Sequence, residues 1–460
     1  MTEFQTDVVI VGGGPAGMAA ARELAAAGLE AIIVDEGLRP GGQIFRQLPK
    51  NFEGGSDPRF ESPSHRAGHQ LIHDVEGTRF LGGVTVWDTE PDRVHAERDG
   101  EAITVRGRRL ILATGAMDRM LPFPGWTLPG VITAGAAQIM VRGQMIRPGQ
   151  RAVVAGTGPL LLPTVTSLLS AGVQVVELFE ANRPGGMLRA LPAVVGNKKR
   201  RREAMHYAWR MFASRVRMKT GRAVIGAYGD GLLERVVFGR LDTEGRLIAG
   251  TEREVEADIL CSGYGLLPSI ELAVKLGCEM HYRDVRGGWL PEHDEEMQTS
   301  VAGVYVAGEI AGIGGGDVAM VEGALAGRSV ASVLGGKTAD PEPLRVQRRA
   351  ERAATDALLS AFPVLPGLYD LARADTVVCR CEDVTMAEVE QASRLFGCDI
   401  RSIKLGTRAG MGPCQARICH RIIGGILQQR LGSSERPTPC PSVQVPIKPV
   451  STRTMNRAVR

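Results

Sequence analysis

Three things are scarce in this sequence: aromatic residues, excess charge of either sign, and long uninterrupted apolar stretches. Aromatic residues make up 5% of the 460-residue chain, and 55 Lys and Arg nearly balance 51 Asp and Glu. Base stacking needs aromatic side chains and phosphate backbones need a basic surface, so the composition argues against nucleic-acid binding. Glycines, Arg22 and Glu23 interrupt the apolar stretch near the N-terminus. We therefore expect neither a signal peptide nor a membrane span, and a cytoplasmic protein.

Cysteine is also missing from more than half of the chain. The first of the eight cysteines is Cys261, and five of the eight lie between 379 and 419. In a reducing compartment such clustering favours a metal site over disulfide bonds.

The stretch from Asp7 to Asp35 has the pattern of a strand, a glycine-rich turn, a helix and a second strand. In a Gly-x-Gly-x-x-Gly turn the first glycine makes the tight turn, the second lets the backbone approach a pyrophosphate, and the third packs helix against strand. The helix N-terminus favours an anion, and an acid after the second strand accepts from a ribose hydroxyl. This pattern predicts a dinucleotide site, with a glycine-rich turn in an α/β core as the alternative. The predicted site residues are Gly12, Gly14, Pro15, Ala16, Gly17, Asp35 and Glu36.

Three later segments extend this predicted site. A loop with paired glycines follows Asp35 and allows the backbone to lie close to a ligand. One buried strand ends in a small-residue turn suited to an adenosine, and another delivers an acid at its carboxyl end, where it can reach the ribityl chain of a flavin. The residues added by these segments are Gly42, Gln43, Arg46, Thr114, Gly115, Gly308 and Glu309.

The opening pattern repeats once, in residues 151–180. The turn contains Gly156 and Gly158, but Leu161 stands where the third glycine is expected. A leucine there should hold the helix away from the strand, so both nucleotide binding and a retained but empty fold remain open. Acids near the end of the second strand, among them Glu180, favour NAD or ATP over NADP.

Two polar patterns carry weaker signals. His65, His69 and His73 recur every four residues, for which a solvated helix face is a better interpretation than a metal site. The basic run NKKRRR at residues 197–202 predicts a solvated face, with a docking patch for an acidic partner as the alternative.

The C-terminal cysteines have the spacing of a metal or cluster site. A C-x-C pair is followed 32 residues later by a glycine-rich turn and a C-x4-C pair. Four thiolates are the set that a [2Fe–2S] cluster needs. Zinc is the alternative, although structural zinc sites usually separate paired cysteines by two or more residues. The predicted ligands are Cys379, Cys381, Cys414 and Cys419.

The order of these motifs over residues 5–335 resembles the two-dinucleotide-binding-domain flavoproteins, which include glutathione and thioredoxin reductases. The resemblance implies that the first unit holds FAD, with Glu309 where the family more often has aspartate. Dithiol reductases of that family place a cysteine pair beside the flavin or in the inserted domain. This chain has no cysteine before Cys261, so we exclude disulfide reduction.

The C-terminal segment resembles the domain of bacterioferritin-associated ferredoxin, in which the last pair is often C-x2-C. The whole chain, with GGGPAGMAAA, PGGQIFR, PGWTLPGVITAGAAQ and GTRAGMGPCQARIC, is similar to the α subunits of bacterial dye-linked dehydrogenases. These include opine oxidases, D-hydroxyproline dehydrogenase and the B subunit of hydrogen cyanide synthase. The resemblance implies a catalytic flavoprotein β subunit that oxidises an opine, D-hydroxyproline or a related amino acid. This chain would relay the electrons toward the respiratory chain or a dye.

The resemblance also brings further candidates, namely a small ferredoxin-like γ subunit, FMN at the interface between subunits, and attachment at the inner face of the membrane through partners. We name no catalytic residue, since no His, Cys or carboxylate pair stands in a recognisable catalytic pattern. Three alternative functions remain. They are a self-sufficient NAD(P)H-dependent FAD and iron–sulfur reductase, a hydrogen cyanide synthase subunit that oxidises glycine, and a non-enzymatic iron–sulfur carrier or regulatory module, against which the intact first dinucleotide motif argues.

The predicted fold is α/β, with two Rossmann-like dinucleotide-binding domains similar to those of glutathione and thioredoxin reductases and a small C-terminal iron–sulfur domain. The predicted division is a FAD-binding domain at 1–148 and 285–336, a second nucleotide-binding domain at 149–284, a linker at 337–375, a [2Fe–2S] domain at 376–432, and a Pro-rich tail at 433–460.

Overall fold

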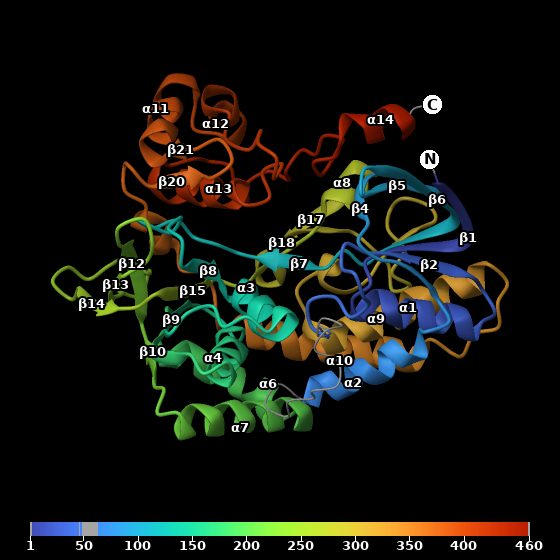
Figure 1. Ribbon diagram of the computed structural model, residues 1–460, viewed down its shortest axis with the longest axis horizontal. Helices are drawn as coiled ribbons and strands as arrows, with labels where there is room; N and C mark the ends of the chain where they lie inside the picture. The colour runs from blue at the N-terminus through green and yellow to red at the C-terminus, as the bar shows by residue number, and fades with distance from the viewer. Residues whose placement is uncertain (1, 46, 48–62, 459–460) are drawn as a thin grey trace.

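A computed structural model describes residues 2–45, 47 and 63–458 of the chain, so Arg46 of the predicted site lies outside the described residues. A mixed sheet and a parallel sheet form separate units, and a smaller domain with a trailing segment follows them (Figure 1). The first unit lies at the right of that view and the second at the left. None of the helices in the described ranges combines the length and apolarity required to cross a membrane.

The first unit is built on a seven-stranded sheet whose centre is parallel. The strand order is β3-β2-β1-β6-β5-β4, and β19 pairs with β6 on its free side. The central strands are covered on both faces, so their sequences are continuous apolar runs. One such run is Val8–Val11, in which every residue is buried. The strands are β1 (Thr2–Val11), β2 (Ala31–Val34), β3 (Arg79–Leu81), β4 (Thr85–Glu90), β5 (Arg93–Arg98), β6 (Glu101–Leu112) and β19 (Val304–Val306).

Two helices of the first unit pack unusually closely, because glycines of one lie against the backbone of the other. A Cβ atom on Gly323 would lie 2.0 Å from the carbonyl oxygen of Ala16, and one on Gly327 would lie 2.6 Å from that of Ala20. This contact fixes α9, which follows the strand β19, against α1, which follows the first glycine turn. The helices of this unit are α1 (Pro15–Ala26), α2 (Pro63–Asp74), α9 (Gly315–Val333) and α10 (Glu342–Leu359).

The second unit has a five-stranded parallel sheet in the order β11-β10-β9-β15-β8, with a three-stranded antiparallel sheet beside it. Its strands are β8 (Val131–Thr133), β9 (Arg151–Gly156), β10 (Gln174–Glu180), β11 (Met218–Thr220) and β15 (Ile259–Gly263), with β12 (Arg222–Tyr228), β13 (Arg235–Arg240) and β14 (Arg253–Glu256) in the antiparallel sheet. Its helices are α3 (Ala134–Gln138), α4 (Leu161–Ser170), α5 (Pro184–Met187), α6 (Leu191–Val195) and α7 (Lys198–Ala213), with a π-helical turn at Ile139–Gly143.

The strand β8 belongs to the second unit, whereas the predicted division placed all residues up to 148 in the first unit. Its Val131 pairs in parallel with Leu260 of β15, so β8 is an edge strand of the second sheet. The strand is three residues long, and a run that short gives no periodicity from which its sheet can be predicted.

Short paired strands join the two units. The strand β7 (Ala116–Asp118) leaves the first unit and pairs antiparallel with β16 (Leu266–Pro268), which returns to it. The helix α8 (Glu271–Lys275) and the hairpin of β17 (Met280–Arg283) and β18 (Gly288–Pro291) follow before β19.

The C-terminal domain shares one apolar core with the second unit. Buried residues of both parts form a continuous cluster, and Trp126 Nε1 donates to the carbonyl oxygen of Val377 at 2.6 Å. The final segment then crosses back to the first unit, where the N–H of Ile447 donates to the carbonyl oxygen of Trp87 at 2.9 Å (Figure 1). The elements are β20 (Val377–Cys379), β21 (Val384–Thr385), α11 (Met386–Phe396), α12 (Ile400–Thr407), α13 (Cys419–Arg430) and α14 (Thr452–Ala458).

Candidate functional site

The first glycine turn has a shape that only glycine permits. Gly12 has a φ of +111°, and a Cβ atom there would lie 2.1 Å from the carbonyl oxygen of Ala113. A Cβ atom on Gly17 would lie 1.9 Å from the carbonyl oxygen of Gly12. Gly14 differs, because the nearest atom to its Cβ position, Gly42 Cα, is 3.9 Å away, and the helix α1 begins there without a side-chain cap. The turn therefore presents free N–H groups to an anion, with no side chain in the way.

The loop after Asp35 lies directly against this turn. The N–H of Gly41 donates to the carbonyl oxygen of Gly13 at 2.8 Å, and a Cβ atom on Gly42 would lie 2.7 Å from Gly14 Cα. Gln43 is exposed at the end of the same loop. The paired glycines thus form one wall beside the turn.

Asp35 stands at the carboxyl end of β2 with both oxygens oriented by the backbone. Oδ2 accepts from the N–H of Gly13 at 2.6 Å, and Oδ1 accepts from the N–H of Gly37 at 2.6 Å. Burial raises the pKa of this carboxyl, while these two N–H groups act in the opposite direction. The neighbouring Glu36 forms an ion pair with Lys448 of the C-terminal segment.

Thr114 and Gly115 form the turn after β6. Thr114 Oγ1 donates to the carbonyl oxygen of Ser269 at 2.6 Å, and the N–H of Ser269 donates to the carbonyl oxygen of Gly115 at 3.0 Å. This turn is thereby tied to the strand β16, which returns from the second unit.

Glu309 follows β19, in a 3₁₀ turn that spans Gly308–Ala311. Its Oε1 accepts from the N–H groups of Gly314 at 3.3 Å and Gly315 at 2.6 Å. Its Oε2 is buried and has no hydrogen-bond partner among the described residues. Burial raises the pKa of this carboxyl. A buried acceptor without a donor is costly unless a ligand supplies one. A hydroxyl of a flavin ribityl chain fits this requirement.

A buried ion pair lies next to the turn that carries Glu309, and no motif in the sequence predicted it. Glu322 of α9 is fully buried, and it accepts from Arg352 at 2.9 and 2.8 Å and from Arg348 at 2.9 Å. Burial raises the pKa of Glu322, but the two guanidinium groups overcome this effect and hold the pKa below its usual value. Glu322 Oε2 also accepts from the N–H of Gly308 at 3.1 Å, next to Glu309. The one feature of the sequence that could have indicated this pair is the single acid, Glu322, within an apolar run.

The second glycine turn repeats the backbone of the first. Gly156 has a φ of +147°, and a Cβ atom there would lie 1.7 Å from the carbonyl oxygen of Gly263. Gly158 also has a positive φ, +102°. Leu161, in the place of the third glycine, is fully buried, and its Cδ2 lies 3.8 Å from the Cβ position of Gly263.

The acid of the second unit is already saturated by its own surroundings. Glu180 is buried, and it accepts from Thr157 Oγ1 at 2.7 Å, from the N–H of Gly158 at 2.9 Å and from the N–H of Asn182 at 2.9 Å. Burial raises the pKa of Glu180. Asn182 Nδ2 in turn donates to the carbonyl oxygen of Pro363 at 3.1 Å.

A segment from beyond α10 lies over the second turn. Phe362 Cβ is 4.0 Å from the Cβ position of Gly158, and the carbonyl oxygen of Ala361 is 3.5 Å from that of Gly186. Residues 361–363 fall in the predicted linker, and no pattern in the sequence indicates this contact.

The four predicted cysteine ligands lie together as two pairs. The thiols of Cys379 and Cys419 are hydrogen-bonded to each other, as are those of Cys381 and Cys414. The hydrogen bond with Cys419, together with backbone N–H groups that include that of Gly410, lowers the pKa of Cys379 to about 5. Within residues 2–45, 47 and 63–458, no three His, Cys, Asp or Glu side chains meet around a single ion position. Paired thiols suit a cluster with two irons, each of which takes two thiolates.

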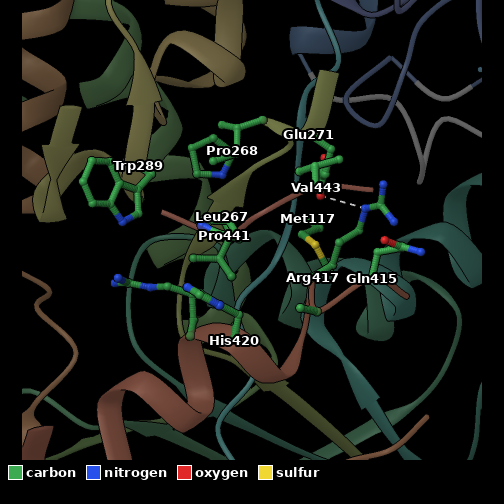
Figure 2. Close-up of a pocket in the computed structure, with 14 residues that line it drawn as sticks. Met117, Leu267, Pro268, Glu271, Trp289, Gln415, Arg417, His420, Pro441 and Val443 are labelled. Carbon is green, nitrogen blue, oxygen red and sulfur yellow. Dashed lines mark ion pairs between the residues drawn. The ribbon is translucent and has the colours of Figure 1, made fainter. Parts of the chain in front are cut away.

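The loop between the last two cysteines is tied to the junction of the two units. Arg417 Nε pairs with Glu271 Oε1 at 2.7 Å, and Arg417 Nη1 donates to the carbonyl oxygen of Cys414 at 3.2 Å. Figure 2 shows this ion pair in a small pocket that lies between the cluster loop, β16 and the C-terminal segment. Glu271 is two residues from Ser269, the partner of Thr114, so a short chain of contacts joins the two cofactor regions.

The remaining polar patterns of the sequence lie on α2 and at the start of α7. His69 and His73 on α2 are exposed, and His73 forms an ion pair with Glu76 at 3.2 Å. The side chain of His65 lies outside the described atoms. Asn197, at the start of the basic run, caps α7 by accepting from the N–H groups of Lys199 and Arg200.

Comparisons with known proteins assign these sites to a class. Residues 6–331 match the family described as pyridine nucleotide-disulphide oxidoreductase, and residues 377–429 match the BFD-like [2Fe-2S] binding domain. Fold and sites together define a flavin-dependent oxidoreductase with an iron–sulfur domain, as the sequence predicted. The chain belongs to the pyridine nucleotide-disulphide oxidoreductase family, and its cofactors are FAD and a [2Fe–2S] cluster.

Relatives of similar length carry both regions. The chain is 34% identical to the A subunit of opine oxidase from Rhizobium meliloti, over 97% of each chain. It is also 34% identical to hydrogen cyanide synthase subunit HcnB of Pseudomonas aeruginosa, over 92% of this chain and 93% of the relative. The L-proline dehydrogenase structure from P. horikoshii has the same fold, with a TM-score of 0.73, 22% identity, and coverage of 99% of this chain and 80% of that one.

Proposed function

We propose that this chain is the electron-transfer subunit of a heteromeric dehydrogenase that oxidises an opine, D-hydroxyproline or a related amino acid. The observation that carries the proposal is the similarity to the A subunit of an opine oxidase over 97% of both chains, which includes both cofactor regions. When bound, FAD takes up a pair of electrons and releases them singly to a cluster that takes one at a time. A catalytic flavoprotein β subunit supplies the electrons, and a respiratory-chain or dye acceptor receives them.

The first unit holds FAD in this proposal. The N–H groups at the start of α1 bind the pyrophosphate, Asp35 accepts from the adenosine ribose, and Glu309 Oε2 accepts from a ribityl hydroxyl. The orphaned oxygen of Glu309 supports this assignment, because it leaves one buried acceptor for a ligand donor. The proposed FAD contacts are Gly12, Gly14, Pro15, Ala16, Gly17, Asp35, Glu36, Gly42, Gln43, Arg46, Thr114, Gly115, Gly308 and Glu309.

The C-terminal domain holds the cluster through Cys379, Cys381, Cys414 and Cys419 in this proposal. The pairing of the thiols and the N–H groups directed at Cys379 support it. The Arg417–Glu271 pair keeps the cluster loop fixed against the junction of the units. No residue of this chain is proposed to act on the amine itself.

The geometry of the second unit favours the relay over an NAD(P)H-dependent reductase. NAD or ATP at Gly156 and Gly158 would need a free acid, whereas Glu180 already accepts four hydrogen bonds of the unit itself at 2.7 to 3.2 Å. Glycine is the second candidate substrate, because the identity to the hydrogen cyanide synthase subunit is also 34%. A γ subunit, interfacial FMN and membrane attachment through partners stay predictions of the resemblance, and a cytoplasmic location stays a prediction from the sequence.

The test uses the chain purified anaerobically, alone and co-expressed with an amino-acid-oxidase-like flavoprotein subunit. Flavin and iron are assayed, and the absorption spectrum is followed during titration with NADH, octopine, nopaline, D-hydroxyproline and glycine. We expect bleaching of the flavin by one of the amines, in the complex alone. Rapid bleaching of the isolated chain by NADH would replace the relay with a reductase, and zinc in place of iron would remove the one-electron step.

A further inference from the structure

The helix α7 turns its polar side toward the protein. Arg200, Tyr207 and Arg210 recur at helical spacing on this inner face. Arg200 Nη2 donates to Glu351 Oε2 at 3.1 Å, and Arg210 Nη2 donates to Ser170 Oγ at 3.2 Å. A surface helix ordinarily packs its apolar side inward and leaves its polar side to water. In α7 the inner side is mainly polar, although Met211 also packs against the apolar core of the second unit.

The outer face of α7 is correspondingly apolar. Met205, Trp209 and Phe212 follow one another at intervals of four and three residues, and they are 60%, 64% and 84% exposed. The adjacent α6, which contacts α7, exposes Leu191 and Val195 as well. We call these five residues the α6–α7 face. Large apolar side chains that gather on one surface mark an interaction site, and tryptophan is enriched at the centres of interfaces.

Cations border the α6–α7 face at both ends of α7. Lys198, Arg201 and Arg202 are exposed in the first turn, and Arg215 and Arg217 are exposed just after the helix. An apolar centre with a charged rim is the usual arrangement of a protein interface. The sign of the rim fits a partner that carries carboxylates around an apolar patch of its own.

The α6–α7 face adjoins the flavin region, and this position indicates which partner binds. Lys199, in the first turn of α7, forms an ion pair with Asp317 in the first turn of α9. Two residues earlier, the N–H of Gly315 donates to Glu309 at 2.6 Å. A protein that delivers electrons to the flavin must bind close to it, whereas attachment to a lipid surface sets no such requirement.

We propose that the α6–α7 face is the docking surface for the substrate-oxidising partner subunit, through an apolar patch on that subunit with an acidic rim. This inference rests on the proposed function, which requires such a partner. It also gives the basic run at residues 197–202 a role, since its exposed cations Lys198, Arg201 and Arg202 steer the partner and fix its orientation.

The experiment uses the full chain with its cofactors and a co-expressed amino-acid-oxidase-like flavoprotein subunit. The double variant Trp209→Glu with Phe212→Glu places two charges on the α6–α7 face. Both side chains are exposed, so the isolated variant should keep the melting temperature, flavin and iron of the parent. The control is Leu405→Glu, which changes an equally exposed apolar residue, 66% exposed, on α12 of the C-terminal domain.

We expect the double variant to bind the partner at least about tenfold more weakly and the control to bind it normally. Partner-driven reduction of the flavin should fall with binding. A second variant, Arg201→Glu with Arg202→Glu, should slow association and reduce its dependence on salt. Partner binding at the parent's affinity by both variants would overturn the proposal.

Three other outcomes separate the alternatives. If the parent complex forms but no amine reduces it, the proposed function fails and the docking surface stands. If the double variant keeps the partner but loses binding to vesicles of phosphatidylcholine and phosphatidylserine, the face belongs to a membrane and the proposal is wrong. If it keeps the partner but loses self-association in sedimentation, the face belongs to a second copy, and the proposal is again wrong.

Discussion

The two dinucleotide-type units have the same turn but different surroundings. In both, a glycine with positive φ lies against a carbonyl oxygen of the neighbouring strand, at Gly12 and at Gly156. In the first unit, Glu309 keeps a buried oxygen without a donor, while in the second Glu180 is saturated and residues 361–363 lie over the turn. A glycine motif therefore predicts the backbone conformation of a site. Whether the site is open depends on residues far away in the sequence.

The largest effect should come from the turn of the first unit. We expect Gly12→Ala to lower the free energy of unfolding by at least about 3 kcal/mol, because the new Cβ atom overlaps Ala113 and φ is positive. Flavin should be lost with it. Gly28→Ala is the control, since its φ is also positive but no atom lies within 4 Å, and it should cost about 1 to 2 kcal/mol. Denaturant unfolding and the flavin content of the purified variants measure both effects. Equal costs at the two positions would contradict the steric explanation.

The next effect concerns the buried ion pair, a feature of the first unit. Arg352→Met leaves Glu322 as a buried charge with one guanidinium fewer, and we expect a loss of about 3 to 5 kcal/mol together with weaker FAD retention. The matched change Arg349→Met on the same helix removes a cation that is 53% exposed, and it should leave the free energy of unfolding nearly unchanged. Thermal unfolding with and without added FAD distinguishes the two. A variant Arg352→Met that unfolds like Arg349→Met would show that the pair does not support the flavin region.

The third effect compares the two acids. Glu180→Gln should cost about 1 to 3 kcal/mol and leave the flavin content unchanged, because this carboxylate serves only its own unit. Asp35→Asn should mainly lower FAD affinity. The free energy of unfolding and the flavin content are measured for both variants. Loss of FAD from Glu180→Gln would contradict the prediction that this carboxylate serves only the second unit.

The effect of Glu180→Gln should also depend on pH. Burial raises the pKa of Glu180 in the folded protein above its ordinary value of 4.5. The folded state therefore binds the proton more tightly, and this carboxyl contributes less stability as pH rises from about 4.5 through the raised pKa. The glutamine variant lacks this titration. The stability gap between parent and variant should consequently narrow as pH rises, and a gap that widens would show that the pKa is lowered instead.

The sequence predicted the parts of these sites that depend on local backbone. The two glycine turns, the acids Asp35 and Glu309, and the four cysteines all lie where the motifs indicated. It did not predict contacts between distant segments. Arg352 reaches Glu322 across 30 positions, and Pro363 reaches Asn182 across 181. Arg417 and Glu271 are likewise joined only by the fold, because no local pattern pairs residues of different domains.

The smallest effect should come from uncovering the second unit. Asn182→Ala removes the hydrogen bonds that Asn182 Nδ2 donates to Pro363, Thr157 and Glu180. Together with Phe362→Gly, which removes the side chain over Gly158, we expect a loss of about 1 to 3 kcal/mol. NADH should still fail to reduce the flavin rapidly, because Glu180 keeps the donors Thr157 Oγ1 and the backbone N–H groups of residues 158 and 182. Anaerobic stopped-flow mixing with NADH measures this rate in the parent and in the variant. Fast reduction in the variant alone would mean that the cover by itself closes the second unit. The hydrogen bonds that saturate Glu180 would then not be what prevents nucleotide binding in the second unit.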